Sequence, residues 1–180
     1  MPDARTPADL VIRRLGAADV AAYRDLMLEA YERHPDAFTS SVAERRALPM
    51  AWWDARLDAS PAAASVVLGA FEAQRLAGVV GIEFERREKA RHKAALFGMY
   101  VPPPFRQRGL GRALVRAALD CIRTRPGVTI VQLTVTDGNG AARSLYEACG
   151  FTAFGVEPFA VAVGTDYVAK VHMWRKLEGS

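Results

Sequence analysis

The sequence predicts a single domain of the α/β or α+β class. Stretches typical of strands alternate with stretches typical of helices along the whole chain, an arrangement that builds a sheet covered by helices. At 180 residues, of which 51% are hydrophobic, the chain is long enough for one well-filled core and short for two. It contains no internal repeat or low-complexity segment. We therefore expect one domain over residues 1–180, with its core at about 10–176.

The first part of the chain predicts a strand, a helix and a loop. Residues 10–14 suit a strand, and Ala18 with Asp19 would cap a helix that ends before Pro35. Residues 35–40 are typical of a loop. The helix would bury one apolar stripe, made of Val20, Tyr23, Met27, Ala30 and Tyr31.

A second helix follows, and two signals compete for its start. Ser41 with Glu44 three residues later matches a capping box, in which both side chains pair with the first amides of a helix. Pro49 would break a helix that ran straight on from there, so we place Pro49 in the first turn of the second helix. That helix carries Trp52, Trp53 and Leu57.

Three strands are expected in the middle of the chain, at Ser65–Glu72, Leu76–Arg87 and Lys93–Val101. Residues two apart on a strand share a face, which groups Glu83 with Glu85 in the second strand. Glu85 leads into a charged turn and is expected to be solvated. Glu83 lies deeper in the strand, which makes it the better candidate for a functional carboxylate.

Two helices and three strands account for the rest of the chain. An amphipathic helix from Leu110 to Arg123 precedes a buried strand at Val128–Val135 and a helix at Asn139–Cys149. Two closing strands are supplied by Phe151–Phe154 and Val161–Val163, then Asp166–Trp174.

The stretch from Leu96 to Leu114 joins a strand to a helix through a turn that can bind an anion. Three prolines end the strand, and Gly109 and Gly111 let the backbone turn tightly and approach a ligand. The first amides of the next helix have no partner within it, so phosphate is the expected ligand. A P-loop would need Lys-Ser/Thr after its glycines, and a dinucleotide-binding turn would need a small residue in place of Leu114.

The remaining match is Arg106-x-x-Gly109-x-Gly111 after an apolar strand, which resembles the pyrophosphate loop of the GNAT superfamily of acyl-CoA-dependent N-acyltransferases. A second motif further along the chain is similar to that family's second signature, which combines Asn, Ala, Leu-Tyr and Gly-Phe at fixed spacing. The resemblance covers the C-terminal two-thirds of the chain well and the N-terminal third loosely. The second motif is filled by Asn139, Ala142, Leu145, Tyr146, Gly150 and Phe151.

The resemblance implies a fold with a recognisable cofactor site. The sheet would be mixed and mostly antiparallel, with about six to seven strands and about four flanking helices. The strands that end at Val101 and Val135 would be splayed apart where the cofactor enters. Gly98 is then a plausible β-bulge, because a bulge bends the strand that contains it.

The resemblance also implies roles in binding acetyl-CoA and in catalysis. Loop amides would dominate diphosphate binding, because a charge-assisted bond contributes about 1.5–3 kcal/mol and an exposed arginine pair only about 0–1 kcal/mol. The Val101 amide would bond the pantetheine arm, the Met99 amide would face the thioester oxygen, and Asn139 would bond the cofactor arm. Tyr146 stands at the general-acid position, where it would protonate the leaving thiolate. The loop residues are Arg106, Gln107, Arg108, Gly109, Leu110, Gly111 and Arg112.

The general base is where the sequence departs from the family. Several relatives carry a glutamate on the strand before the loop, four residues ahead of the oxyanion donor, and this sequence has Ala95 there. Glu83 on the neighbouring strand, directly or through a water, is our first candidate. His92 and Glu85 come next, and a mechanism that uses already neutral amine without a base stays open.

The leading hypothesis is an N-acetyltransferase that moves the acetyl group of acetyl-CoA to a primary amine by direct attack in a ternary complex. The acceptor would be a small molecule or a peptide N-terminus, bound near Phe38, the tryptophan pair and Glu157–Tyr167. For the tryptophans a role in the core is favoured over contact with substrate. The alternative is a non-catalytic acyl-CoA-binding sensor or interaction module, which Ala95 favours and Tyr146 disfavours.

Composition limits the other partners. A net charge of +4 is modest, and arginines near the loop suit a polyanionic cofactor, so no nucleic acid is expected. No apolar run could span a bilayer and the first residues lack a signal peptide, so we expect a cytoplasmic protein without a membrane partner. Cys121 and Cys149 are expected in the core, and the three histidines lack ligand spacing, so no metal is expected. A homodimer stays open.

Overall fold

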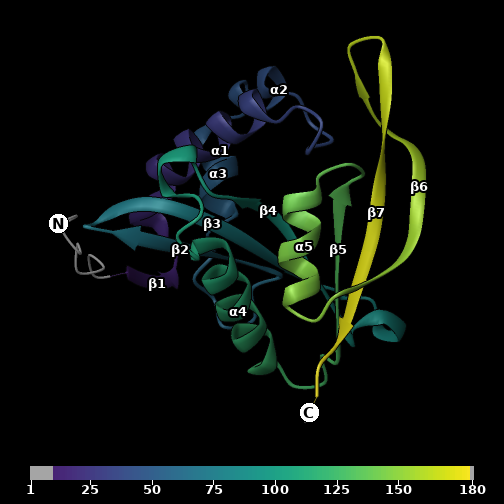
Figure 1. The fold of residues 1–180 in the computed structure, drawn as a ribbon. Coiled ribbons are helices and arrows are strands. Elements are labelled where there is room, and N and C mark those ends of the chain that lie inside the picture. Colours follow the sequence, from purple (N-terminus) through teal and green to yellow (C-terminus); the bar gives the residue numbers. More distant parts are fainter. Residues whose placement is uncertain (1–9, 179–180) are drawn as a thin grey trace, which may run out of the picture.

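A computed structural model describes residues 10–178, which form one seven-stranded sheet packed with helices (Figure 1). The strand order is β1-β2-β3-β4-β5-β7-β6, and all neighbours are antiparallel except β4 and β5. The strands are β1 (Leu10–Arg14), β2 (Ser65–Glu72), β3 (Arg75–Phe84), β4 (Lys93–Tyr100), β5 (Ile130–Thr136), β6 (Thr152–Val163) and β7 (Asp166–Lys176).

Five α-helices accompany the sheet over these residues, one more than expected. They are α1 (Val20–Arg33), α2 (Val42–Arg46), α3 (Met50–Ala55), α4 (Leu110–Arg123) and α5 (Gly140–Ala148). The predicted mixed, mostly antiparallel sheet is confirmed. The expectation about a signal peptide concerns the first residues and lies outside the described part of the chain.

The centre of the sheet is buried on both faces. Val66 and Val80 pack with α4 in the larger core, whereas their chain neighbours Val67 and Val79 pack with α1 and Trp53 on the opposite face. Successive side chains of a strand point to opposite faces, so a strand covered on both sides must be apolar throughout. This explains the unbroken apolar runs of β2 and β3.

The parallel strands β4 and β5 pair over a short distance and then part. Their register covers only residues 93–95 of β4 with 130–132 of β5. On its other side β4 contains a bulge, because Phe97 pairs with Gly81 and Tyr100 with Val79, so that β4 has one residue more than β3 in this interval. Gly98 lies within the bulge with φ of 57°, a conformation that glycine adopts at little cost. The splayed strands and the bulge at Gly98 are as predicted.

The helices after the first loop differ from the prediction. The capping box at Ser41 is real: its hydroxyl accepts the Glu44 amide, and the Glu44 carboxylate accepts the Ser41 amide. It begins the short helix α2, which the sequence analysis did not count. Pro49 then caps α3 with an extended backbone (ψ 157°) and is not in its first turn, as we had placed it. Each start signal therefore begins its own helix.

The closing strands also differ from the prediction. The two segments Phe151–Phe154 and Val161–Val163 belong to one strand, β6, whose pairing with β7 is irregular after Ala153 and after Glu157. The second irregularity contains Pro158 and Phe159, which has φ of 53°. Proline cannot donate to the ladder and is tolerated at a bulge, so the break in the apolar pattern marks a bulge and not a loop.

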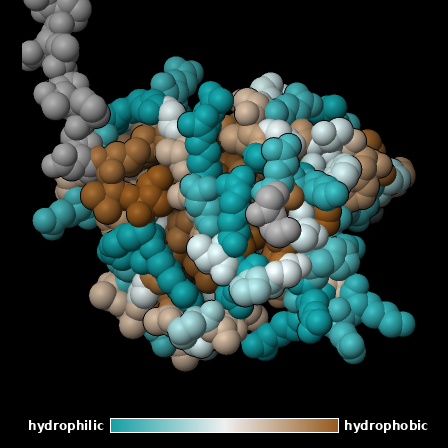
Figure 2. All heavy atoms as spheres, turned by 90° about the horizontal axis from the view of Figure 1, so that it is seen from below, coloured by the Kyte–Doolittle hydropathy of each residue, from teal (hydrophilic) through white to brown (hydrophobic). Residues whose placement is uncertain are grey.

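The outer strands of the sheet carry its most exposed apolar side chains. Seen from below, most of the surface is polar, with an apolar patch beside the grey residues (Figure 2). Phe159 and Tyr167, at the far end of the β6–β7 hairpin, pack edge to face at 5.6 Å and are 76% and 62% exposed. The other exposed large apolar residues on these strands are Leu10, Val11, Phe154, Val156 and Trp174.

Candidate active site

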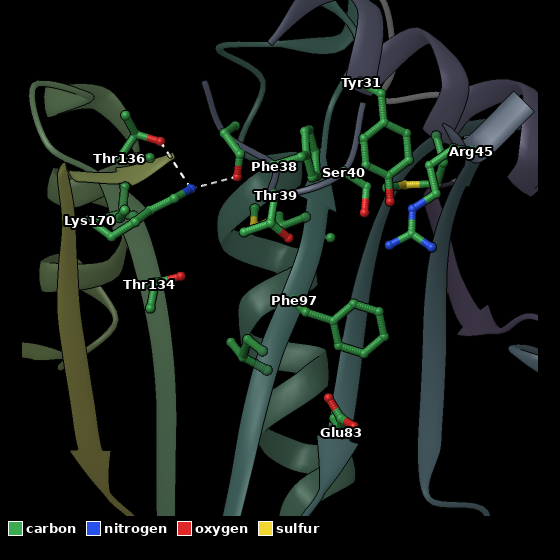
Figure 3. Close-up of a pocket in the computed structure, with 18 of the residues that line it drawn as sticks. Tyr31, Phe38, Thr39, Ser40, Arg45, Glu83, Phe97, Thr134, Thr136 and Lys170 are labelled. Atoms are coloured by element: carbon green, nitrogen blue, oxygen red, sulfur yellow. Dashed lines mark hydrogen bonds between the residues drawn. The ribbon is translucent and has the colours of Figure 1, made fainter. Parts of the chain in front are cut away.

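A cleft of about 440 Å³ lies where β4 and β5 part, and it is lined by residues from both ends of the chain (Figure 3). Helix α1, the loop after it, α2 and α3 contribute to one wall, and β5, α5 and β7 to another. Four residues predicted for the site from sequence line the cleft together: Glu83, Met99, Asn139 and Tyr146.

The glycine loop lies next to the cleft. A Cβ at Gly111 would stand 3.1 Å from Met99 Cε and 3.2 Å from Leu145 Cδ2, so the start of α4 packs directly against β4 and α5. Only glycine allows this close approach without displacing a neighbour. The predicted loop and the predicted acid therefore both contact Met99 near the end of β4.

The backbone amides of the loop are its available donors. Gln107 and Gly109 have φ of 59° and 80°, and no acceptor among the described residues pairs with the amides from Gln107 to Arg112. The arginine side chains are partly engaged: Arg106 Nε donates to the Val101 carbonyl at 2.8 Å, and Arg108 donates to the Glu72 carboxylate at 3.0 Å. Unpaired amides at a helix N-terminus form an anion site, so the residues present fit a diphosphate.

Tyr146 is buried on the α5 side of the cleft. Its hydroxyl donates to Met99 Sδ at 3.4 Å, and its ring packs edge to face on Phe151. Burial raises the pKa of Tyr146 to about 12, because the phenolate would lose its hydration. The hydroxyl therefore stays protonated at neutral pH and can serve as a proton donor.

Asn139 has a structural role that the sequence analysis did not assign. Its Oδ1 accepts the Ala142 amide at 3.1 Å, so Asn139 caps α5. The side-chain amide nitrogen is not used in that bond and remains able to donate.

Glu83 lies beside the position at which relatives carry their glutamate. In the β3–β4 ladder Glu83 pairs directly with Ala95, and directly opposed residues of an antiparallel pair place their side chains on the same face. The glutamate is exposed to the cleft (Figure 3). A carboxylate on β3 can thus reach the space that one at Ala95 would occupy.

The two other candidates for the base do not line the cleft. The Glu85 carboxylate binds the Arg87 guanidinium and accepts the amides of Arg86 and Arg87, which lowers its pKa to about 2. His92 lies in the turn before β4 and is exposed. Their ranking behind Glu83 agrees with this placement.

The acceptor end of the cleft was only partly predicted. Phe38, Trp52, Trp53 and Glu157 line it as expected, whereas Tyr167 does not. The two tryptophans differ, because Trp53 is 1% exposed in the core and Trp52 is half-buried at the wall. The sequence analysis missed three cations of this lining, Arg45, Arg56 and Lys170. No signal marked them, since arginines on short helices usually belong to a solvated face.

Lys170 on β7 connects the loop after α1 to β5 and β7 through hydrogen bonds. Its Nζ donates to the Ala37 carbonyl at 2.7 Å and to Thr136 Oγ1 at 3.3 Å, and the Thr136 hydroxyl donates to the Asp36 carbonyl at 3.0 Å (Figure 3). Burial lowers the pKa of Lys170. The residues on β5 and β7 thereby fix the loop that includes Phe38.

The cysteines lie outside this machinery. Cys149 is buried, Cys121 is half-buried, and burial raises the pKa of both thiols, as expected for core residues. Within residues 10–178, no three His, Cys, Asp or Glu side chains gather as a metal site. Over the same residues, no helix has the length and apolar character needed to cross a membrane.

Comparison with known proteins identifies the family. A model of the acetyltransferase (GNAT) family matches residues 21–151, and this chain belongs to that family. A GNAT-family acetyltransferase from Streptococcus pneumoniae has the same fold, with a TM-score of 0.85, 22% identity and coverage of 94% of this chain and 100% of that one. The yncA structure from Salmonella typhimurium, which contains its cofactor acetyl-CoA, has a TM-score of 0.78, 22% identity and coverage of 96% of each chain. The predicted family and fold are confirmed.

Curated relatives match over shorter parts. The [ribosomal protein bS18]-alanine N-acetyltransferase of Salmonella typhimurium is 46% identical over 59 residues, which are 33% of this chain and 39% of that protein. The mycothiol acetyltransferase of Salinispora tropica is 30% identical over 156 residues, which are 84% of this chain and 47% of that protein. The chain thus spans less than half the length of these relatives, and their named acceptors differ.

Proposed function

We propose that this protein transfers the acetyl group of acetyl-CoA to a primary amine by direct attack in a ternary complex. The observation that carries the proposal is the position of Met99, which packs against Gly111 in the loop of unpaired amides and accepts the buried Tyr146 hydroxyl, at the end of β4 that parts from β5. Family membership supports the same reaction class. Acetyl-CoA supplies the activated acyl thioester.

Backbone amides make most of the proposed contacts with the cofactor. The Arg106 amide already donates to the Pro103 carbonyl at 3.2 Å, so the amides from Gln107 to Arg112 hold the diphosphate, with the arginine side chains adding long-range attraction. The Val101 and Met99 amides serve the pantetheine arm and the thioester oxygen, and Asn139 donates its side-chain amide to the arm. The direct contacts come from backbone and amide groups, since Arg106 and Arg108 already have partners in the protein.

Tyr146 is the proposed general acid. With a pKa of about 12 it gives up a proton less readily than an ordinary phenol, by roughly 3 kcal/mol for the two-unit rise. The site must therefore stabilise the phenolate as the thiolate takes the proton. Its hydroxyl already donates to a sulfur atom, that of Met99, so it is directed toward the kind of acceptor that the reaction presents.

Glu83 is the proposed general base, directly or through one water. Its support is the cross-strand pairing with Ala95, which offers a carboxylate to the space that a glutamate at Ala95 would reach. The attacking amine loses its proton to this carboxylate as the carbon–nitrogen bond forms.

The second candidate function is a non-catalytic acyl-CoA sensor, which Ala95 still favours. Release of CoA from acetyl-CoA, followed with a thiol reagent against alkylamines, amino acids and short peptides, decides between the two. An enzyme gives amine-dependent release well above hydrolysis, whereas a sensor binds CoA in a calorimeter and releases thiol only slowly with every amine. No heat of binding at millimolar CoA would reject both.

A further inference from the structure

The acceptor end of the cleft contains a stacked group of arginines and aromatic rings. Trp52 lies between two guanidinium groups, with Arg45 Cζ and Arg56 Cζ each 4.6 Å from its ring. Arg45 also lies 5.5 Å from the ring of Tyr31, and Arg56 lies 5.4 Å from that of Phe97. Stacking on rings holds each guanidinium flat and in place, but it leaves the N–H groups in the ring plane able to bind an anion.

The glycine at position 81 makes room for this arrangement. A Cβ at Gly81 would lie 2.4 Å from the Phe97 ring, so the ring occupies the space over Gly81 on the neighbouring strand. Phe97 then supports Arg56 from the side of the sheet. The position of the second arginine is therefore fixed by the packing of the cleft.

Five charged side chains line the cleft, and two of them already have partners. Lys170 is bonded to Ala37 and Thr136, and Glu157 to His172 at 3.0 Å. Among the described residues, no ion pair includes Arg45, Arg56 or Glu83. The cleft thus contains two cations, Arg45 and Arg56, and one anion, Glu83, that have no charged partner among the described residues.

Two buried donors belong to the same lining. Arg45 Nε and Trp53 Nε1 are buried and have no hydrogen-bond partner among the described residues. A buried donor without an acceptor costs free energy, and more so when it is charged. A negative charge bound through the other N–H groups of Arg45 would offset that cost, because it stabilises the guanidinium as a whole.

We infer that the acceptor is a small amine that also carries a carboxylate, an amino acid or a close analogue, with the carboxylate bound by Arg45 and Arg56. The inference rests on the proposed function and adds the substrate class. A guanidinium binds a carboxylate through two parallel hydrogen bonds, and Glu83 provides the opposite charge for the ammonium group. The aromatic wall formed by Tyr31, Phe38 and Trp52 suits an apolar side chain. A polyamine would meet two uncompensated arginines and bind poorly.

The test compares the common L-amino acids with their carboxamides in the thiol-release assay, using the wild type, Arg45→Gln, Arg45→Lys and Arg46→Gln. The amide differs only in lacking the negative charge, and its amine loses a proton more easily, so basicity cannot favour the acid. We expect at least one acid to exceed its amide in kcat/KM by about 10- to 100-fold, the value of a charged hydrogen-bonded pair. Arg45→Gln should lower kcat/KM for the acid by that factor more than for its amide, so that the preference is lost, and Arg45→Lys should restore part of it. Arg46, exposed and outside the cleft, should leave the preference unchanged when replaced.

Other outcomes overturn the inference or the function separately. If amides and simple alkylamines are acetylated as well as every acid, or if Arg45→Gln weakens acid and amide equally, the carboxylate site is wrong and the acetyltransferase stands. If no amine supports thiol release, the proposed function fails. Calorimetric titration of the same acids in the presence of CoA then decides the site, since binding lost in Arg45→Gln supports it and binding retained overturns it.

Discussion

The two sides of the cleft are built in different ways. The cofactor side comes from two continuous stretches, β4 through the glycine loop into α4, and β5 into α5. The acceptor side joins segments that are far apart in sequence, and Lys170 reaches the carbonyl of Ala37 across 133 residues. Recognition of a common cofactor can therefore be a property of local sequence, whereas recognition of the acceptor depends on tertiary contacts.

The strongest test of the cofactor side is Tyr146→Phe. Loss of a general acid lowers the rate by about 10²- to 10⁴-fold, so kcat should fall by that factor while the affinity for CoA stays nearly constant. Steady-state kinetics and calorimetry measure the two effects. Tyr100→Phe is the matched control, because its hydroxyl donates to Glu29 at 3.0 Å and does not line the cleft. An unchanged kcat in Tyr146→Phe would show that the acid is another group.

The second test removes the close packing of the glycine loop. Gly111→Val places a branched side chain against Met99 and Leu145, where a Cβ alone is already tight, and we expect it to displace the loop from its position at the start of α4. The loss of two charged backbone bonds weakens CoA binding by at least about 100-fold. Calorimetry should show this loss, whereas Gly155→Val, where a Cβ meets nothing within 4 Å, should bind CoA normally. Normal binding by Gly111→Val would contradict the assigned phosphate site.

The third test concerns the boundary between the two sides. Glu83→Gln removes the proposed base, so kcat/KM for the amine should fall on the order of 100-fold at neutral pH. The deficit should shrink as the pH rises, because the amine then loses its proton without help. Glu85→Gln is the control, since Glu85 lies outside the cleft and binds Arg87. A deficit that stays the same at every pH would argue for a positioning role of Glu83.

The last test concerns the pH dependence of the free energy of unfolding, to which both sides of the cleft contribute. Tyr23 on the acceptor side and Tyr146 on the cofactor side are both buried, and burial raises both pKa values to about 12. The unfolded chain loses these protons near pH 10, so the contribution of the two tyrosines to stability should be constant below pH 10 and fall between pH 10 and 12 by roughly 3 kcal/mol for each tyrosine. Urea unfolding at a series of pH values measures the slope. Replacing either tyrosine with Phe should remove its share of the slope, and the exposed Tyr167→Phe should not.

The same contrast explains how far the sequence could be interpreted. Both motifs are local residue patterns, because turns and caps depend on backbone chemistry, and the splayed strands and the bulge at Gly98 were expected from the family resemblance that the motifs carry. The pairing of Glu83 with Ala95 depends on strand register, which no local pattern states. The stacking of Arg45 and Arg56 on Trp52 depends on how three short segments pack, so these arginines could not be distinguished from solvated ones.

The bulge in β4 has a further consequence for how this chain tolerates change. The additional residue that β4 has opposite β3 turns the end of β4 away from β5. The opening between β4 and β5 therefore depends on the number of residues here as well as on their type. Deleting Gly98 would remove the bulge, so that β4 and β5 could stay paired beyond Ala95 and Gln132 and close the gap between them. A deletion of this one residue should therefore leave the protein folded but abolish acetyl transfer. Most changes in a buried strand are expected to do the opposite and lower stability first.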